Sequence, residues 1–164
     1  MTGIAGVWSR EMTALLLLWS QALPPSPLPG RVAEIVGCYE ISVSGRGADV
    51  VRRRLPALME LLAEGVSGRP PAKVPELGDR AVRGISSGRE VRVEEMRWRL
   101  VSGGGGCEVV WGFGMDDDVR LKLVREGDAL VGTARPPGQG PGGNRPALTI
   151  QMKRISCDEL PKRE

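Results

Sequence analysis

The sequence predicts an all-β domain, an eight-stranded antiparallel up-and-down barrel. Cys38 and Cys157 bracket a stretch that divides into eight short strand-like runs. The clearest runs alternate apolar and polar residues with a period of two, which is typical of half-buried strands. Runs rich in Pro and Gly at 65–78, 102–106 and 135–146 are predicted to be loops.

An export leader precedes the barrel. Arg10 is followed by an apolar run from Met12 to Trp19, and Ser20-Gln21-Ala22 supplies small residues for cleavage, so residues 1–22 are predicted to be a signal peptide. The run is shorter than the roughly 20 apolar residues of a transmembrane helix. Because Glu11 cancels the charge of Arg10, an N-terminal amphipathic helix stays an alternative.

Three further segments complete the predicted organisation. Residues 23–34 are expected to be a Pro-rich linker, extended over residues 23–33, residues 35–157 the barrel, and residues 158–164 a charged C-terminal tail. The sequence before Cys38 is similar to a lipobox, but charged and Pro-rich residues separate it from the apolar run. Lipid anchoring at Cys38 is therefore not expected.

The first half of the barrel contains one clear strand and two weaker candidates. Residues 39–43 alternate from Tyr39 onward. Residues 55–64 fit a short helix at least as well as a strand, because Pro56 suits a first helical turn. Residues 79–85 carry few apolar side chains, so their strand is the weakest prediction.

The fourth run, residues 91–101, changes face in its middle. Val91 and Val93 share one face, whereas Trp98 and its alternate neighbours Met96 and Leu100 share the other. This change predicts a β-bulge near Glu94 and Glu95.

The second half of the barrel is predicted more firmly. Cys107, Val109, Trp111 and Phe113 share one face of a strand. Residues 119–125 and 129–134 are predicted to form a hairpin, because Glu126-Gly127-Asp128 is a tight-turn sequence. A last strand at 148–152 ends shortly before Cys157.

A disulfide between Cys38 and Cys157 is expected. In an up-and-down barrel with an even strand count, the first and last strands are antiparallel neighbours, so these cysteines would meet at the seam. Such a bond persists outside the reducing cytosol, which agrees with export to the periplasm or the exterior. Cys107 is left over, and burial as a small apolar side chain is preferred to a reactive thiol.

The sequence offers no catalytic residues, cofactor or metal site. The chain has no histidine, which excludes Ser-His-Asp and Cys-His activation and imidazole metal ligands. The acidic clusters, Glu94-Glu95 and Asp116 to Asp118, consist of adjacent residues that point to opposite faces of a strand. The formal charge of +3 comes from arginines spread along the chain, so nucleic-acid binding is not expected either.

Four aromatic side chains, Tyr39, Trp98, Trp111 and Phe113, are the candidate ligand-binding residues. All four lie on predicted strands beside aliphatic neighbours. An eight-stranded barrel is wide enough either to be filled by its own side chains or to hold one small ligand. The sequence is compatible both with aromatic side chains that fill the core and with aromatic side chains that line a cavity.

Several segments together resemble small exported bacterial proteins of unknown function with lipocalin-like barrels. They are Gly37 to Ile41, Val109 to Gly114, Leu121 to Ala134 and the closing Cys157. The resemblance implies the barrel fold and export, and it implies that residues 55–64 are the second strand. It transfers no site residues.

Two functional hypotheses lead, and an enzyme ranks third because a chain without histidine would need carboxylates that the fold brings together. In the first, the exported barrel binds a small apolar molecule inside. In the second, it is a non-catalytic structural or protein-interaction module of the cell envelope. An apolar or basic surface patch beside a closed core would favour the second.

Overall fold

The protein is almost entirely β-structure. The structure, a computed structural model, describes residues 30–68, 72–93, 95–102, 105–112, 118–135 and 148–160. Within those ranges the elements are α1 (Gly30–Ile35), β1 (Gly37–Ser44), α2 (Ala48–Arg52), β2 (Leu58–Gly65), η1 (Pro75–Leu77), β3 (Arg80–Ser86), β4 (Arg89–Val91), β5 (Glu95–Leu100), β6 (Gly106–Gly112), β7 (Val119–Glu126), β8 (Ala129–Arg135), β9 (Leu148–Ile155) and η3 (Cys157–Glu159).

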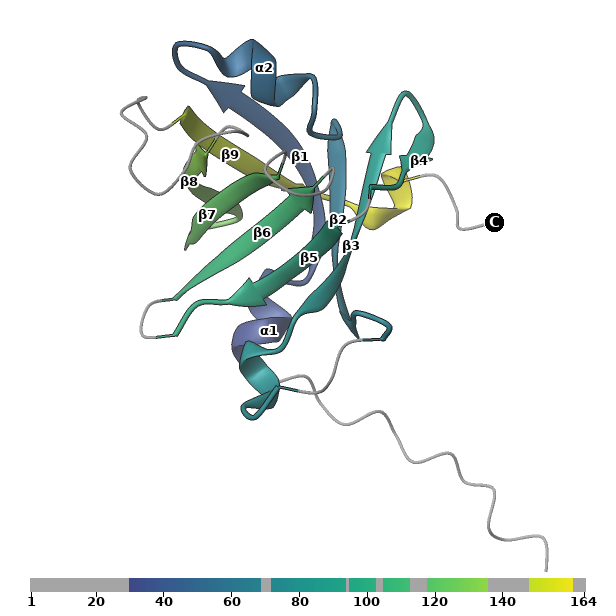
Figure 1. The fold of residues 1–164 in the computed structure, drawn as a ribbon, viewed down its shortest axis with the longest axis vertical. Helices are drawn as coiled ribbons and strands as arrows, with labels where there is room; N and C mark the ends of the chain where they lie inside the picture. Colours follow the sequence, from purple (N-terminus) through teal and green to yellow (C-terminus); the bar gives the residue numbers. More distant parts are fainter. Residues whose placement is uncertain are drawn as a thin grey trace, which may run out of the picture.

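Eight strands close into an antiparallel barrel, as predicted. The strand order is β2-β1-β9-β8-β7-β6-β5-β3-β4, and an additional β2–β3 pairing joins the two sides of the sheet. β4 pairs with β3 alone and lies beside the ring rather than in it. Figure 1 shows α1 at one end of the barrel and α2 at the other.

The closing seam lies between the first and last strands. β1 pairs with β9 in an unbroken antiparallel register from Cys38↔Ile155 to Ser44↔Thr149. This register brings the C-terminal end of β9 beside the start of β1. The disulfide forms there, between Cys38 and Cys157, with 5.2 Å between the Cα atoms. Both the seam and the disulfide confirm the prediction.

Two tight hairpins join neighbouring strands. Glu126 pairs with Ala129 across a two-residue turn, in which Gly127 has a φ of 59°. The predicted β7–β8 hairpin is therefore confirmed. Ser87 and Gly88 both have positive φ, 51° and 74°, between β3 and β4. Two consecutive positive φ values are typical of a type I′ turn, whose twist matches the flanking strands.

Residues 55–64 do not form a helix. β2 begins at Leu58 and pairs with β1 on one side and β3 on the other. Met59 and Leu61 point into the barrel and are fully buried. Tertiary burial has overridden local helix propensity here, as it often does. The strand that the resemblance implied is correct.

The predicted linker and tail boundaries need correction. Residues 30–34 belong to α1 and are not extended, because Val32 and Ile35 bury their side chains in the core. The rest of the linker and the predicted leader lie outside the described residues. At the other end, Leu160 packs with Cys38 and Ile85 on the outside of the barrel. The first residues of the predicted tail are therefore part of the folded domain.

The predicted bulge near Glu94 and Glu95 is a longer interruption. Gly84 pairs with Val91 on β4, whereas Ala81 pairs with Arg97 on β5. Between these two pairs, two residues of β3 face five residues on the other side, three more than a regular ladder holds. Glu94 itself lies outside the described residues. The change of face was predicted correctly, but its size was not.

The barrel interior is a continuous apolar core. Alternate residues of every barrel strand point inward, and α1 and α2 add Val32, Ile35, Ala48 and Val51. Trp111 of β6 reaches across to β3, where its indole lies over Gly84 and beside Pro56. Only glycine leaves room for the indole at that position. The core thus extends from one helical cap to the other.

Candidate functional site

The aromatic residues predicted to bind a ligand lie in the interior but are fully packed. Tyr39 is 1% exposed, and Trp98 and Trp111 are 0% exposed. All three belong to one core cluster, so the prediction that they share the interior is correct. Phe113 lies outside the described residues.

Tyr39 helps to close the α1 end of the barrel. Its hydroxyl donates a hydrogen bond to the Ile35 carbonyl at 2.6 Å, and burial raises the pKa of this phenol. Arg154 of β9 lies over the ring at 5.6 Å. The same guanidinium donates to the Glu34 and Val36 carbonyls and to the Tyr39 hydroxyl. Tyr39 is thus a structural partner of α1.

Trp98 has a similar role beneath η1. Its indole nitrogen donates to the Leu62 carbonyl at 2.8 Å. Arg80, 7% exposed, lies 5.4 Å from the ring centroid and donates to the carbonyls of Pro75, Glu76 and Gly78. A buried cation is stabilised by such bonds and by the ring face. Arg80 therefore binds η1, and Arg154 binds α1, at the same end of the barrel.

Trp111 fills the interior nearer to α2. Its six-membered ring occupies the space above Gly84, which a side chain at that position would otherwise fill. The indole nitrogen is buried and has no hydrogen-bond partner among the residues that the structure describes. Together with Tyr39 and Trp98, this residue makes the interior a packed core. Sequence alternation had placed the three residues inside, but it could not show whether space was left beside them.

The free cysteine is buried and has low reactivity. Cys107 is fully buried on the inner face of β6. Burial raises the pKa of its thiol from 9.0 to about 12. Because the thiolate is the reactive form, this residue is not a nucleophile near neutral pH. The preference for a small buried side chain is confirmed.

An apolar hollow that is open to solvent lies at the α1 end of the barrel. It has a volume of about 860 Å³ and is bounded by the ends of β5, β6 and β7 and by η1. Leu100, Cys107 and Leu123 contribute buried surface. Val101 and Val124 stand at the rim and are 43% and 50% exposed. We call this the rim hollow.

Charged side chains border the rim hollow on the barrel wall. Arg99 of β5 pairs with Glu108 of β6 at 2.6 Å, and Lys122 of β7 follows in the same cross-strand row. The Arg99–Glu108 pair is internally neutral, whereas Lys122 adds a positive charge. The border is therefore weakly basic beside apolar side chains.

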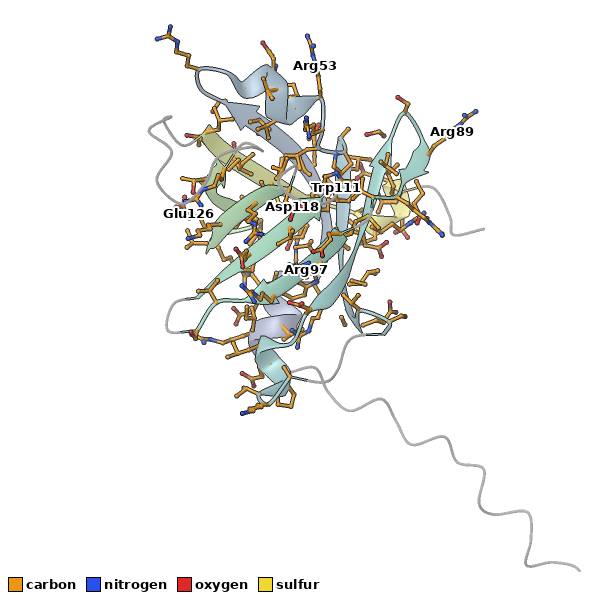
Figure 2. All side chains as sticks on the ribbon, in the orientation of Figure 1. Arg53, Arg89, Arg97, Trp111, Asp118 and Glu126 are labelled. Atoms are coloured by element: carbon orange, nitrogen blue, oxygen red, sulfur yellow. A yellow bond between two sulfur atoms is a disulfide. The ribbon has the colours of Figure 1, made fainter. Side chains whose placement is uncertain are left out.

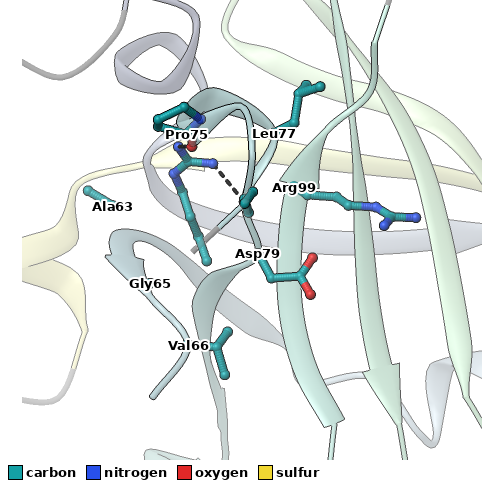
Figure 3. Close-up of a pocket in the computed structure, with 10 residues that line it drawn as sticks. Ala63, Gly65, Val66, Pro75, Leu77, Asp79 and Arg99 are labelled. Carbon is teal, nitrogen blue, oxygen red and sulfur yellow. Dashed lines mark hydrogen bonds between the residues drawn. The ribbon is translucent and has the colours of Figure 1, made fainter. Parts of the chain in front are cut away.

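A second hollow adjoins the first and shares Leu77 and Arg99 with it. It has a volume of about 520 Å³ and lies between the end of β2 and η1. Figure 3 shows Pro75 and Leu77 at one end of it, Val66 at the other, and Arg99 extending to the side opposite Ala63. Its lining is more polar, and Arg80 forms part of its wall.

Sequence reasoning missed both hollows. Their walls come from chain segments that are far apart in sequence, and η1 lies in a stretch that was predicted only to be a loop. One signal was available: Val101 and Val124 are apolar residues at the ends of strands, where the alternation predicts an outward side chain.

The described residues provide no evident metal centre. Among them, no three Cys, Asp or Glu residues lie close enough to hold a metal ion. Of the acidic clusters, Glu94, Asp116 and Asp117 lie outside these residues. The helices described are too short to cross a membrane.

Comparison with known proteins gives no relative for this chain. No protein family, curated protein or solved structure matches it.

Proposed function

We propose that this chain is an exported, non-catalytic interaction module in which the filled barrel is a scaffold and the rim hollow receives apolar side chains of a partner protein. The observation that carries the proposal is an exposed apolar hollow beside a closed core. Exposed apolar patches on a packed domain commonly mark interaction sites.

The packed interior argues against the alternative, a small apolar ligand inside the barrel. Such a ligand would have to displace Trp98 or Trp111, which are 0% exposed. Each of these indoles buries a large apolar area, and removing it from a core costs roughly 3–5 kcal/mol. The rim hollow is open to solvent and needs no such displacement.

The border of the rim hollow favours a protein partner. Its apolar rim lies beside the Arg99–Glu108 pair and Lys122. Protein interfaces commonly combine an apolar centre with a charged rim. A partner would place one or two apolar side chains against Val101 and Val124, with a carboxylate facing Lys122.

Export is supported by the disulfide. A bond between Cys38 and Cys157 would be reduced in most cytosolic environments and persists outside them. The predicted signal peptide and the resemblance to exported lipocalin-like barrels point the same way. A mature N-terminus after Ala22 is the expected product of cleavage.

A non-catalytic role is supported by the side-chain chemistry. The chain contains no histidine. Several acidic residues of the described sheet pair with arginines, as Glu60 and Glu90 do with Arg83 and Glu108 does with Arg99. Acid/base catalysis by two carboxyl groups requires them to converge on a substrate.

Site-specific photo-crosslinking tests the proposal. A photoreactive residue in place of Val124 is expected to yield a discrete protein adduct in cells that export the chain. The adduct should be lost when Val101→Asp is added, since a buried charge opposes apolar docking. Thr133, exposed on β8, is the matched control position and should give no such adduct.

Two results would overturn the proposal. One is an adduct at Val124 that Val101→Asp leaves unchanged. The other is a copurified small apolar molecule, seen by native mass spectrometry, that Trp111→Phe releases and Val101→Asp retains. Because Val101 is 43% exposed, its substitution should change the free energy of unfolding by no more than about 0.5 kcal/mol, which urea unfolding checks.

A further inference from the structure

We propose that the α2 end of the barrel is a docking surface for a membrane that carries anionic phospholipid. The surface consists of residues 46–54, which we call the arginine cap. It lies at the end of the barrel opposite α1 (Figure 1) and is independent of the rim hollow.

The arginine cap is anchored on one side and charged on the other. Ala48 and Val51 of α2 are 6% and 0% exposed and belong to the barrel core. Asp49, Val50 and Arg52 lie on the solvent side of the same short helix. Figure 2 shows Arg53 directed away from the barrel at this end. The core thus fixes the cap while its polar face stays accessible.

The arginine cap carries a net positive charge. Its nine residues hold four arginines and one aspartate, a net charge of +3, which equals the formal charge of the whole chain. Asp49 pairs with Arg52 at 2.7 Å, and Arg52 also donates to the Val43 carbonyl at 2.9 Å. These bonds orient one guanidinium, while Arg46 and Arg53 are exposed.

Within the part of the chain that the structure describes, neither Arg46 nor Arg53 forms an ion pair with an acidic side chain of a neighbouring element. Ser86 of β3 accepts a hydrogen bond from the backbone nitrogen of Ala57, which joins the β3–β4 hairpin to the chain after the cap. Arg89 and Glu90 follow the turn of this hairpin and are both exposed. Figure 2 shows Arg89 directed outward, whereas Glu90 pairs with Arg83 and Arg92. On β7, Arg120 and Asp118 lie 3.7 Å apart and balance each other.

An exposed apolar residue in the cap favours a lipid surface. Val50 is 53% exposed and sits between the arginines. Basic residues beside an apolar side chain suit the membrane interface, where arginine binds phosphate groups and the apolar side chain enters the acyl boundary. Single-stranded nucleic acid is instead bound by basic residues with stacking aromatics. Residues 46–54 include no aromatic residue.

Vesicle flotation of the purified chain tests the inference. Binding is expected to vesicles of phosphatidylcholine with about one third phosphatidylglycerol, and not to phosphatidylcholine alone. It should fall as salt is raised, because exposed charges are screened. Arg46→Gln with Arg53→Gln should weaken binding about 25-fold, at roughly fivefold for each arginine.

Three further variants sharpen the test. Lys73→Gln with Lys153→Gln removes the same charge from exposed positions elsewhere and should change binding by less than about twofold. Asp49→Asn should strengthen binding to the anionic vesicles about fivefold, because it removes the one negative charge of the cap, and should leave phosphatidylcholine vesicles unbound. Val50→Gln should weaken vesicle binding without changing binding to an oligonucleotide.

Three outcomes would overturn the inference. The first is equal binding to vesicles with and without phosphatidylglycerol. The second is an equal loss in the lysine control, which would mean that net charge acts without the cap. The third is oligonucleotide binding that is tighter than vesicle binding and falls by the same factor when Arg46 and Arg53 are replaced.

Discussion

Removing the disulfide is expected to cost about 5 kcal/mol of the free energy of unfolding. Cys38 and Cys157 are separated by 119 positions, so the bond closes nearly the whole domain into a loop. On the chain-entropy account, closing a loop of this size removes about 16 cal/mol/K from the unfolded chain. Single domains are typically stable by about 5–15 kcal/mol in total, so the bond supplies a third of that or more.

The folded state should change little when the bond is lost. β1 and β9 remain paired from Cys38 to Ser44, and that register does not depend on the sulfur atoms. The segment around Cys157 and Leu160 would be freed from the outer surface, where Leu160 is 8% exposed. The main effect should therefore be on the unfolded chain, with a smaller loss from this apolar contact.

Urea unfolding measures the effect, with the fluorescence of the buried Trp98 and Trp111 as the signal. Wild type should unfold at a much lower urea concentration after reduction, and Cys38→Ala with Cys157→Ala should match the reduced protein. Cys107→Ala is the control, since it keeps the disulfide and should lose a similar amount on reduction. A loss below about 1 kcal/mol would refute the chain-entropy reasoning.

Two other predictions concern the core. Gly84→Ala should lower the free energy of unfolding by roughly 1–3 kcal/mol, because the new methyl group would overlap the Trp111 indole. Gly105→Ala is the control, since its methyl group would meet open space. Equal urea midpoints for the two variants would contradict the packing of Trp111 against Gly84. Burial raises the pKa of the Cys107 thiol from 9.0 to about 12, so iodoacetamide should label it at pH 8 at least about 1000-fold more slowly in the folded protein than in urea. Because the Cys107 thiol ionises at a lower pH in the unfolded chain than in the folded protein, raising the pH favours unfolding. The contribution of this thiol to the free energy of unfolding is therefore complete below pH 9 and declines as the pH rises toward 12. A flat stability profile in that range for wild type relative to Cys107→Ala would contradict the burial.

The sequence predicted the fold where local pattern and tertiary structure agree. In β7 and β9, alternating residues are buried, and the Gly127 turn has the tight connection that its sequence suggests. β2 was harder, because residues 55–64 have high helix propensity and become a strand only through pairing with β1 and β3. That pairing depends on segments distant in sequence, which local propensity does not register.

The short helices were missed although each carries a weak signal. Val32 and Ile35 of α1, and Ala48 and Val51 of α2, are spaced three residues apart and are buried together. Elements of five or six residues give too few positions for a helical period to stand out.

The candidate sites were predicted least well. Alternation placed Tyr39, Trp98 and Trp111 inside the barrel, but whether they line a cavity depends on cross-barrel contacts such as the Trp111–Gly84 contact. The rim hollow depends on how loops from several strands converge. Such convergence is a property of the closed sheet and leaves little trace in any one segment.

The covalent seam also has a mechanical consequence. Cys38 and Cys157 join the folded chain near both of its ends, and residues between them form a closed loop. Tension applied through an N-terminal attachment and a C-terminal attachment would pass from one cysteine to the other through the sulfur atoms and would not load the hydrogen bonds between β1 and β9. Oxidised, the barrel could therefore be pulled from both ends without unzipping its seam. Reduced, the same pull would act directly on the β1–β9 ladder.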